Sequence, residues 1–395
     1  MAYYTGMTRT SHAITADRVV REVDQTLILE PDARVAPFLW LCRQNKKPTG
    51  NPKFESMYMA QQLRKDTVQA NITSAATSVV VANAGQFRVY DTAFNPRTFE
   101  SIFITDVDRA TNTLTIVRGN GTTAAAMNAA DELYVTGSAS PEGDSRLSAV
   151  GQQPTFDYNY TEIFRHSVEV SRTQLNTDEY GPNDIQEEKR RKWNLMMLEI
   201  EARFMTGGRH IINSGDDVIR FTQGIIPALG TGAHVLNQAG NILKSELDAY
   251  LEPRFSYGSD NGTKIGLCNL MFLRVLNQMV ESFLEKDMDA QTAAWGWKFV
   301  NYNAYYGTLK CHESRLLTRM FPTTGVCLVI DPPFVRCRYL RNSDIAWYMP
   351  DKDTQLIDGV IGEWLCEMGL EVKTDPNNPT QSPHGWLYGI TGFGS

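Results

Sequence analysis

The longest regular pattern in the chain is GPNDIQEEKRRKWNLMMLEIEARFMTGG, residues 181–208. Its large apolar side chains recur at spacings of three and four, at Trp193, Met197, Ile200 and Phe204. Such a stripe is typical of a helix that buries one face. Asn183 with Gln186 fits an N-cap and capping box, and Gly207 fits a helix end. The pattern predicts a helix over 183–206, and about 23 residues at 1.5 Å each make a spine of roughly 34 Å.

The same helix carries a run of four basic residues, Lys189, Arg190, Arg191 and Lys192. Glu187 and Glu188 precede two of them by four positions, a spacing that brings opposite charges together on a helix surface. A nucleic-acid patch is one interpretation of the run. Because the glutamates lie one turn earlier, a solvated face or a face in a subunit interface is the better interpretation.

The composition shifts in the segment before this helix, between residues 72 and 137. Short β-branched or aromatic runs recur there between turn residues, at Thr77–Val81, Gln86–Tyr90, Phe99–Ile104, Thr113–Val117 and Glu132–Thr136. About five short strands in about sixty residues predict a compact antiparallel barrel or sandwich. We interpret 72–137 as a module inserted into a host domain, with extended polar flanks at 49–71 and 138–160.

Helical and strand patterns alternate after the spine helix, which predicts an α/β layer domain over 240–334. Ser245 with Asp248 fits the capping box of one helix, which would end near Phe255. A second amphipathic stripe consists of Phe272, Val275, Leu276, Met279 and Phe283. Strands are expected at Ile265–Cys268, at Val326–Ile330 in the centre of the sheet, and at Val335–Tyr339. The remainder, 335–395, is again rich in strand patterns.

Residues 1–48 lack a sustained helical or strand period, but they contain an apolar patch at Phe38, Leu39, Trp40 and Leu41. A segment of this kind has little core of its own, so it lies against its own body or reaches onto a neighbour. A disordered tail is the alternative, and the patch around Trp40 argues against complete disorder.

Composition excludes several classes of protein. Hydrophobic residues make up 42% of the 395 residues, enough for a sizeable core. The formal net charge is -7, which argues against a protein whose main task is to grip nucleic-acid phosphates. The six cysteines form no C-x-x-C pair, and we expect them to be reduced and buried. No uninterrupted apolar stretch approaches eighteen residues, which argues against a membrane span.

The usual catalytic and cofactor motifs are missing from the sequence. It has no phosphate-binding P-loop and no G-x-S-x-G nucleophile elbow. His312-Glu313 beside Cys311 lacks the further ligands that a metal site needs. We therefore expect no catalytic residue, no cofactor and no metal, and a structural protein rather than an enzyme.

Three stretches carry a resemblance to a known family. They are the strands from Gly85 to Val135, the strand at Val168–Ser171 with the helix ending at Gly207, and the closing region from Asp331-Pro332 to His384-Gly385. In their order and spacing they resemble the tailed-bacteriophage major capsid protein of the Hong Kong 97 fold. The match is with the branch of major head proteins that carries a β-rich insertion in the extended loop.

The resemblance implies a mixed α+β fold with a set order of parts. These are an N-terminal arm (1–48), an extended loop (49–71 and 138–160) around the inserted domain (72–137), a peripheral domain with the spine helix (161–239), an axial α/β domain (240–334) and returning peripheral strands (335–395). The resemblance also implies self-assembly. Copies would form pentamers and hexamers of an icosahedral shell around double-stranded DNA, which is bound without sequence specificity.

The resemblance further implies partners and a place of action. A portal protein, a scaffolding protein and decoration proteins are the expected partners, and the shell would assemble in the host bacterial cytoplasm. The residues expected at subunit interfaces are Phe38, Leu39, Trp40, Arg64, Lys65, Lys189, Arg190, Arg191 and Lys192. Lys65 lies near the extended loop, but the pattern assigns no crosslink to it, and we expect non-covalent assembly.

Three alternatives remain at this stage. An encapsulin-like nanocompartment shell would share the fold but enclose protein cargo. A hydrolase with a β-type binding module would need paired carboxylates or an activated nucleophile, which no motif supports. Another virion component, such as a tail or decoration protein, is disfavoured by the long spine helix.

Overall fold

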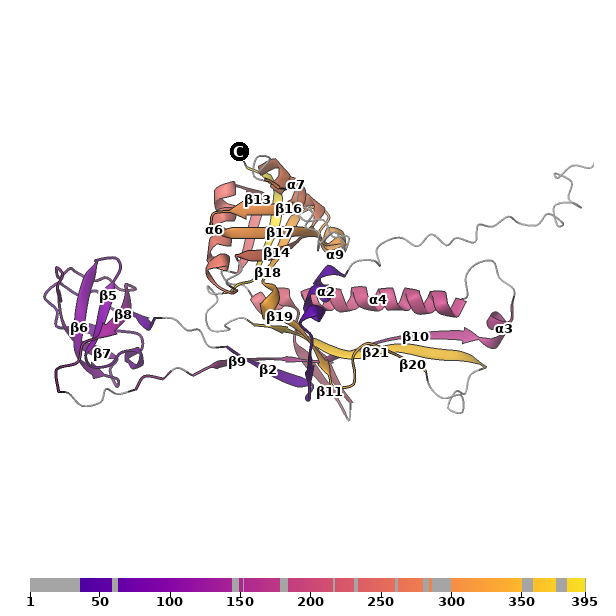
Figure 1. Cartoon of the computed structure of the whole chain (residues 1–395), viewed down its shortest axis with the longest axis horizontal. Coiled ribbons are helices and arrows are strands. Elements are labelled where there is room, and N and C mark those ends of the chain that lie inside the picture. Colours follow the sequence, from indigo (N-terminus) through magenta and orange to yellow (C-terminus); the bar gives the residue numbers. More distant parts are fainter. Residues whose placement is uncertain are drawn as a thin grey trace, which may run out of the picture. The chain divides into compact units, whose positions relative to one another are not determined.

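The computed structural model describes two compact units. Residues 57–155 form one, which we call the β unit, and the residues before and after them form the other, the main unit. Figure 1 shows both along the chain. The described residues are 36–58, 63–143, 149–151, 153–177, 184–215, 217–230, 234–259, 262–279, 284–285, 300–349, 358–373 and 382–394.

A five-stranded sheet forms the first layer of the main unit, in the order β1-β19-β21-β10, with β20 also paired to β21. Its strands are β1 (Lys47–Thr49), β10 (Glu162–Ser171), β19 (Val335–Leu340), β20 (Ala346–Tyr348) and β21 (Gly359–Val372). The antiparallel pair β10–β21 extends from Glu162 opposite Met368 to Ser171 opposite Gly359. This long pair forms a platform for the helix that packs on it.

Helix α4 (Asp184–Thr206) is the expected spine, and it runs along β10 and β21 (Figure 1). Ile200 and Phe204 are completely buried, Met197 packs against the same core, and the Trp193 ring lies 4.6 Å from that of Trp364 on β21. The predicted stripe is therefore confirmed. Met196 and Met205 are buried beside it. The helix ends at Gly207, while the proposed cap Asn183 lies outside the described residues.

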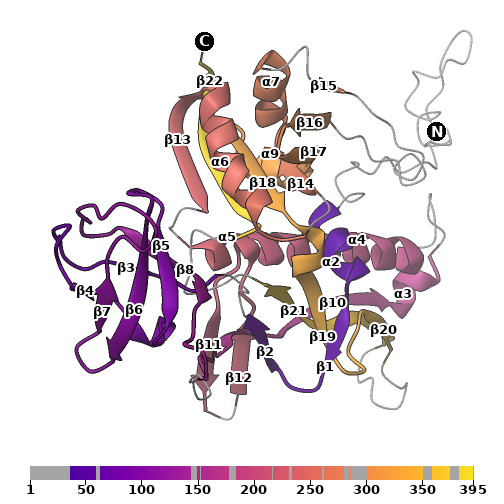
Figure 2. The same ribbon diagram turned by 60° about the vertical axis from the view of Figure 1, so that its left-hand side comes forward.

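A seven-stranded sheet forms the second layer, in the order β13-β22-β18-β14-β17-β16-β15. Its strands are β13 (Val235–Ile242), β14 (Thr263–Cys268), β15 (Leu284–Glu285), β16 (Val300–Ala304), β17 (Gly307–Glu313), β18 (Gly325–Ile330) and β22 (Gly385–Phe393). Strand β18 lies inside the sheet and is buried throughout, as its apolar run predicts. Helices α6 (Lys244–Ser256), α7 (Leu270–Met279) and α9 (Arg315–Met320) pack around the sheet (Figure 2).

Two sequence predictions for this layer are wrong. Residues 335–395 do not all return to the first sheet, because β22 pairs with β13 and β18 of the seven-stranded sheet. Trp386, Leu387 and Ile390 on β22 are buried there, so the strand needs cover on both faces. Helix α6 starts after Leu243, whose N–H donates to the Glu246 carboxylate at 2.9 Å, so Ser245 is not its cap.

The apolar patch near the N-terminus is a helix, α2 (Pro37–Gln44), which the sequence analysis did not predict. Pro37 occupies the first turn, where its missing N–H costs no hydrogen bond. Phe38, Leu39, Leu41 and Cys42 are buried in the core that α4 and the first sheet share. One short helix therefore anchors the start of the described chain to its own body.

Two further sheets have two strands each. One is the ribbon of β2 (Lys53–Tyr58) and β9 (Thr155–Tyr160), which leads into and out of the β unit. The other is the hairpin of β11 (His210–Ser214) and β12 (Asp217–Phe221). Short elements lie in the connections: α3 (Arg172–Leu175) between β10 and α4, α5 (Ile225–Leu229) between β12 and β13, and η3 (Pro332–Phe334) between β18 and β19.

The β unit is one six-stranded sheet in the order β3-β8-β5-β6-β7-β4. Its elements are β3 (Lys65–Thr67), β4 (Ser78–Val80), η2 (Ala84–Gln86), β5 (Asp91–Asn95), β6 (Glu100–Asp108), β7 (Thr113–Val117) and β8 (Glu132–Ser138). A bridge between Val68 and Val81 joins the two outer strands. The β unit has a core of its own, which includes Phe87, Ile102 and Leu114.

The strands of the β unit differ from expectation in two places. Residues 86–90 are not a strand, because η2 and a turn occupy them and the strand is the next segment, Asp91–Asn95. Strand β3 lies before residue 72, where the module was expected to begin, and it pairs with β8. The apolar Phe87 suggested a strand, but its side chain fills the core from a turn.

The six cysteines are free and buried, as expected. Within the described part of the chain, no helix is long and apolar enough to cross a membrane.

Candidate functional site

The expected interface residues of helix α2 are mostly buried within their own chain. Phe38 and Leu39 expose 0% and 2% of their surface, so the expectation that a neighbour buries them is wrong. Of the two predicted places for this arm, against its own body or on a neighbour, the structure shows the first for Phe38 and Leu39, which helix α2 places in the core. Trp40 is half-buried and is the member of the trio that keeps exposed surface.

A buried carboxyl lies under the start of helix α2. Glu201 of helix α4 is completely buried, and its Oε2 accepts the Leu39 N–H at 3.5 Å. Its Oε1 has no hydrogen-bond partner among the described residues. Burial raises the pKa of Glu201 to about 8. The side chain is therefore largely protonated at neutral pH, and sequence reasoning missed it because Glu201 sits in an ordinary helical pattern.

The basic run on α4 does not act as one surface. The Lys189 ammonium lies over the Trp347 ring at 4.4 Å and the Trp364 ring at 5.3 Å, and Trp364 Nε1 donates to the Lys189 carbonyl at 2.9 Å. Lys189 thus packs on its own sheet, which corrects its expected place facing a neighbour. Arg190 and Arg191 are exposed, and Arg191 pairs with Glu188 at 2.9 Å, not with the expected Glu187.

The root of the β2–β9 ribbon is held by side-chain contacts. The Arg209 guanidinium stacks on the Tyr158 ring at 4.0 Å, donates to the Tyr158 carbonyl and pairs with Asp157 at 3.1 Å. Asn159 is buried and donates to the carbonyls of Gln223 at 3.0 Å and Leu370 at 2.7 Å. These contacts hold β9 against the main unit.

An open cleft of about 840 Å³ lies beside this root. The ribbon residues Lys53, Phe54 and Tyr160 line one part, and Ile211, Val218 and Arg220 of the β11–β12 hairpin line another. Strands β9 and β10 each keep a large apolar side chain exposed, since Phe156 exposes 59% and Ile163 exposes 57%.

Arg64 and Lys65, the expected interface residues of the β unit, have partners inside that unit. Arg64 pairs with the buried Asp91 at 2.8 Å, and Lys65 pairs with Glu132 at 2.8 Å. Lys65 Nζ also donates to the Tyr134 hydroxyl at 3.3 Å. Both cations are therefore used to hold the β unit together.

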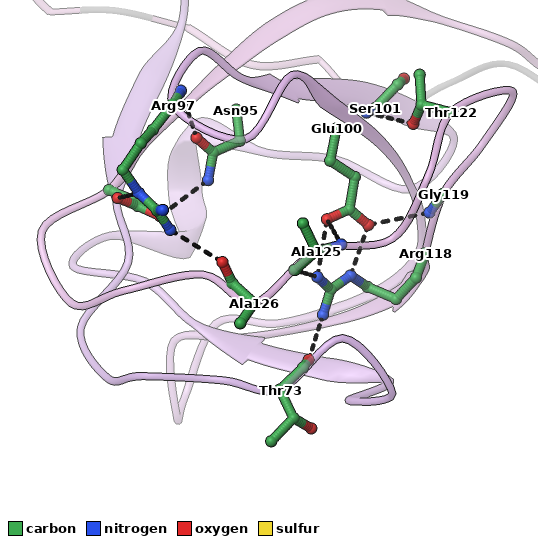
Figure 3. A network of polar contacts seen from close by, with 11 residues as sticks. Thr73, Asn95, Arg97, Glu100, Ser101, Arg118, Gly119, Thr122, Ala125 and Ala126 are labelled. Carbon is green, nitrogen blue, oxygen red and sulfur yellow. Dashed lines mark hydrogen bonds and ion pairs between the residues drawn. The ribbon is translucent and has the colours of Figure 1, made fainter.

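Arginine–carboxylate pairs tie the loops of the β unit together (Figure 3). Glu100 is completely buried and forms two hydrogen bonds with the Arg118 guanidinium, at 2.7 and 2.8 Å. Its carboxylate also accepts the backbone N–H groups of Gly119 and Ala125. Burial opposes ionisation of Glu100, but the hydrogen bonds from Arg118 and these two N–H groups outweigh it and lower its pKa.

A buried ionic cluster lies where the chain passes from the seven-stranded sheet to the five-stranded sheet. Lys264 Nζ lies 3.0 Å from Asp331 Oδ2, and Ser259 donates to the same carboxylate through its N–H and its hydroxyl, both at 2.8 Å. The Asp331 N–H donates to His384 Nδ1 at 3.2 Å, and burial lowers the pKa of His384 to about 3. A lysine inside the apolar strand β14 was the signal that the sequence offered for this cluster.

Among the described residues, no group of His, Cys, Asp and Glu side chains is arranged to hold a metal ion. The cleft and the exposed ribbon residues are the features that point toward contacts between chains.

Comparison with known proteins decides the class. A family model described as SU10 major capsid protein matches residues 23–378. The chain belongs to the SU10 major capsid protein family. The major capsid protein of Pseudomonas phage PaMx41 is 25% identical over 295 residues, which cover 71% of this chain and 69% of that relative. The chain described here is therefore a structural shell protein of a bacteriophage virion. It assembles with copies of itself, and it is not an enzyme.

Two solved structures share the fold of the capsid protein. The holo-SrpI encapsulin complex from Synechococcus elongatus PCC 7942 gives a TM-score of 0.50 at 9% identity, with 97% of this chain and 98% of that chain covered. A structure from Mycobacterium phage Bobi gives 0.51 at 9% identity, with 98% and 100% covered. The likeness confirms a mixed α/β capsid fold, and the family match favours the phage capsid over the encapsulin alternative.

Proposed function

We propose that the capsid protein forms an icosahedral shell of pentamers and hexamers that encloses double-stranded phage DNA. The observation that carries this proposal is the family match together with a main unit built from a spine helix, two sheets and an outgoing ribbon. A net charge of -7 suits a wall that confines DNA without binding it tightly.

The β2–β9 ribbon would be the core of the extended loop, which would be shorter than 49–71 and 138–160 because β3 belongs to the β unit, and the six-stranded β unit would be a domain inserted in the loop. The exposed Phe156 and Ile163 and the cleft beside the β11–β12 hairpin support contact with a neighbouring subunit there. Arg209 and Asn159 would set the direction of the loop.

The remaining parts keep their expected roles as proposals. The seven-stranded sheet, with β22 added to it, would be the axial domain, and the five-stranded sheet with α4 the peripheral domain. Arg190, Arg191 and Lys192 would face a neighbour or the shell interior. A portal protein, a scaffolding protein and decoration proteins would be the partners, and assembly would occur in the host bacterial cytoplasm. Assembly would be non-covalent, since Lys65 already pairs with Glu132.

Residues 1–35 precede helix α2 and lie outside the described residues, and we propose that they are the part of the arm that reaches a neighbour. Truncation at two points tests this. A chain that starts at residue 36 keeps α2 and should fold but fail to close into stable shells. A chain that starts at residue 49 loses Phe38, Leu39 and Leu41 from the core and should be insoluble or far less stable, since burial of each contributes about 1.5–3 kcal/mol.

Size-exclusion chromatography with electron microscopy reads out both truncations. Normal shells from the chain that starts at residue 36 would remove the arm from the assembly proposal. Equal stability of the two truncated chains would contradict the core role of α2. If the full-length protein forms no closed shell under any assembly condition, including co-expression with its virion partners, the proposed function itself fails.

A further inference from the structure

The packing of the β unit does not explain why an aromatic residue stands at Phe99. It lies in the turn between β5 and β6, its side chain exposes 73% of its surface, and its φ is 56°. A residue with a Cβ is strained in this left-handed region, whereas glycine or asparagine tolerates it well. An aromatic side chain that is both strained and exposed gains little from its own chain.

The backbone before Phe99 is fixed by side chains around Asp131. The Asn95 side-chain oxygen accepts the N–H groups of Arg97 at 2.9 Å and Thr98 at 3.3 Å. The Arg97 guanidinium forms two hydrogen bonds with Asp131, at 2.6 and 2.7 Å, and a third with the Ala126 carbonyl (Figure 3). The turn is therefore tied to the loop before β8.

The backbone after Phe99 is fixed by the next residue, Glu100, through the two hydrogen bonds from Arg118. Arg118 also donates to the carbonyls of Thr73 and Ala125, so the pair joins three loops (Figure 3). Strained backbone persists when the surrounding structure over-determines it, and it concentrates at functional positions. Bidentate pairs on both sides of Phe99 supply that constraint.

The surface beside Phe99 is apolar, and its charges are compensated. The Phe99 ring lies 6.3 Å from the Phe94 ring in an edge-to-face arrangement. Strand pairing sets Phe94 opposite Ser101 and Tyr134, and Phe103 opposite Val117, on the side of the sheet that alternates with the buried residues. Next to Phe99 the charged groups form the pairs Arg97–Asp131 and Arg118–Glu100, and Lys65 on β3 pairs with Glu132. Asp106 and Asp108 lie at the other end of β6 and form no ion pair among the described residues.

We propose that Phe99 and the outer surface around Phe94 form a docking surface for the same surface on a second copy of the capsid protein. A two-fold contact sets each group against its own copy, so a surface with uncompensated charge would repel itself. A surface with paired charges and one exposed aromatic avoids this repulsion. Because the turn is already rigid, binding costs little conformational entropy at this position. Phe99 is therefore a suitable anchor.

This inference rests on the assembly function and adds one specific contact to it. The test is Phe99→Asn in the full-length protein, because asparagine tolerates the left-handed backbone and cannot serve as an aromatic anchor. We expect hydrogen exchange in β5 and β6 to slow or stay unchanged. We also expect self-association of the unassembled protein, measured by sedimentation equilibrium, to weaken at least tenfold, and assembled shells to dissociate at lower urea concentration.

Two control variants make the result specific. Phe99→Tyr keeps the ring and should keep wild-type association. Val80→Ser removes another exposed apolar side chain of the β unit, one that lies in β4, and should leave association unchanged.

Each outcome separates one explanation from another. Faster exchange in Phe99→Asn would make Phe99 a structural residue of its own unit and overturn the proposal. Wild-type association and shell stability in that variant would overturn it as well, as would a loss confined to binding of a different virion protein. A wild-type protein that forms no shell at all contradicts the assembly function instead, so the two failures are distinguishable.

Discussion

Glu100 in the β unit and Glu201 in the main unit are both completely buried, yet their surroundings shift the pKa of the carboxyl group in opposite directions. Arg118 and two backbone N–H groups bind Glu100, and its pKa is lowered. The partners of Glu201 are backbone N–H groups of Leu39 and Phe38, and burial raises its pKa to about 8. The two equally buried carboxyl groups therefore differ in one respect, which is that Glu100 has a cationic partner.

The difference has a structural meaning for each unit. The charged Glu100 holds loops in place and makes the β unit rigid around Phe99. The neutral Glu201 closes the contact between α2 and α4 without a buried charge, but it makes that contact sensitive to pH. The β unit thus holds its loops with charged pairs, whereas the main unit contains a helix contact that responds to the protonation of one carboxyl group.

The largest expected effect comes from leaving Glu100 without its partner. Arg118→Met should destabilise the β unit by about 3–5 kcal/mol, because an uncompensated charge would stay buried. Hydrogen exchange of amides in β5, β6 and β8 measures the loss, and amides of β18 in the main unit serve as an internal reference. The double variant Arg118→Met with Glu100→Gln should recover part of it. Equal losses in the single and double variants would contradict the ionised state of Glu100.

The second effect concerns the pH dependence that Glu201 adds. Its folded pKa of about 8 lies above the ordinary value of 4.5, so its contribution to stability is full below about pH 4.5 and is lost as pH rises toward 8. Glu201→Gln should remove this slope and raise the stability at pH 8 by at most ~5 kcal/mol. Urea unfolding of the unassembled protein between pH 5 and 8 gives the slope.

Glu199→Gln is the matched control for this experiment. Glu199 lies two positions earlier on α4, is largely exposed and pairs with His166 at 2.7 Å. Its substitution should leave the slope between pH 7 and 8 close to that of the wild type. If Glu201→Gln keeps the wild-type slope, the Glu201 side chain is not protonated in the folded protein.

The sequence predicted the features that depend on local periodicity. Helix α4, the apolar strand β18 and the stripe of α7 were recognisable because one buried face repeats at a fixed spacing. Strand β22 was assigned to the wrong sheet, because the choice of sheet depends on pairing partners far apart in the chain. Helix α2 is too short for a clear period, and its burial depends on α4 and β19.

The candidate site was less predictable than the fold. Lys189 and Arg190 are neighbours in one basic run, and their sequence context is the same. The structure separates them because only Lys189 reaches the rings of Trp347 and Trp364 on other strands. Phe99 and its pairs Arg97–Asp131 and Arg118–Glu100 likewise depend on loops that meet in three dimensions. Such contacts leave no periodic signal.

The smallest expected effect concerns Lys189 and Arg190. Lys189 lies over two aromatic rings, whereas Arg190 is exposed. Lys189→Ala removes a cation from two tryptophan rings and should destabilise the main unit by about 1 kcal/mol. Arg190→Ala, the matched control, removes an exposed cation and should change stability by less than about 0.5 kcal/mol. Urea unfolding followed by tryptophan fluorescence measures both variants. Because α4 carries both residues, the higher helix propensity of alanine would raise the stability of both variants alike, and equal losses would contradict the cation–ring contact. A loss of shell assembly in Arg190→Ala with unchanged stability would place the exposed part of the run in a subunit interface.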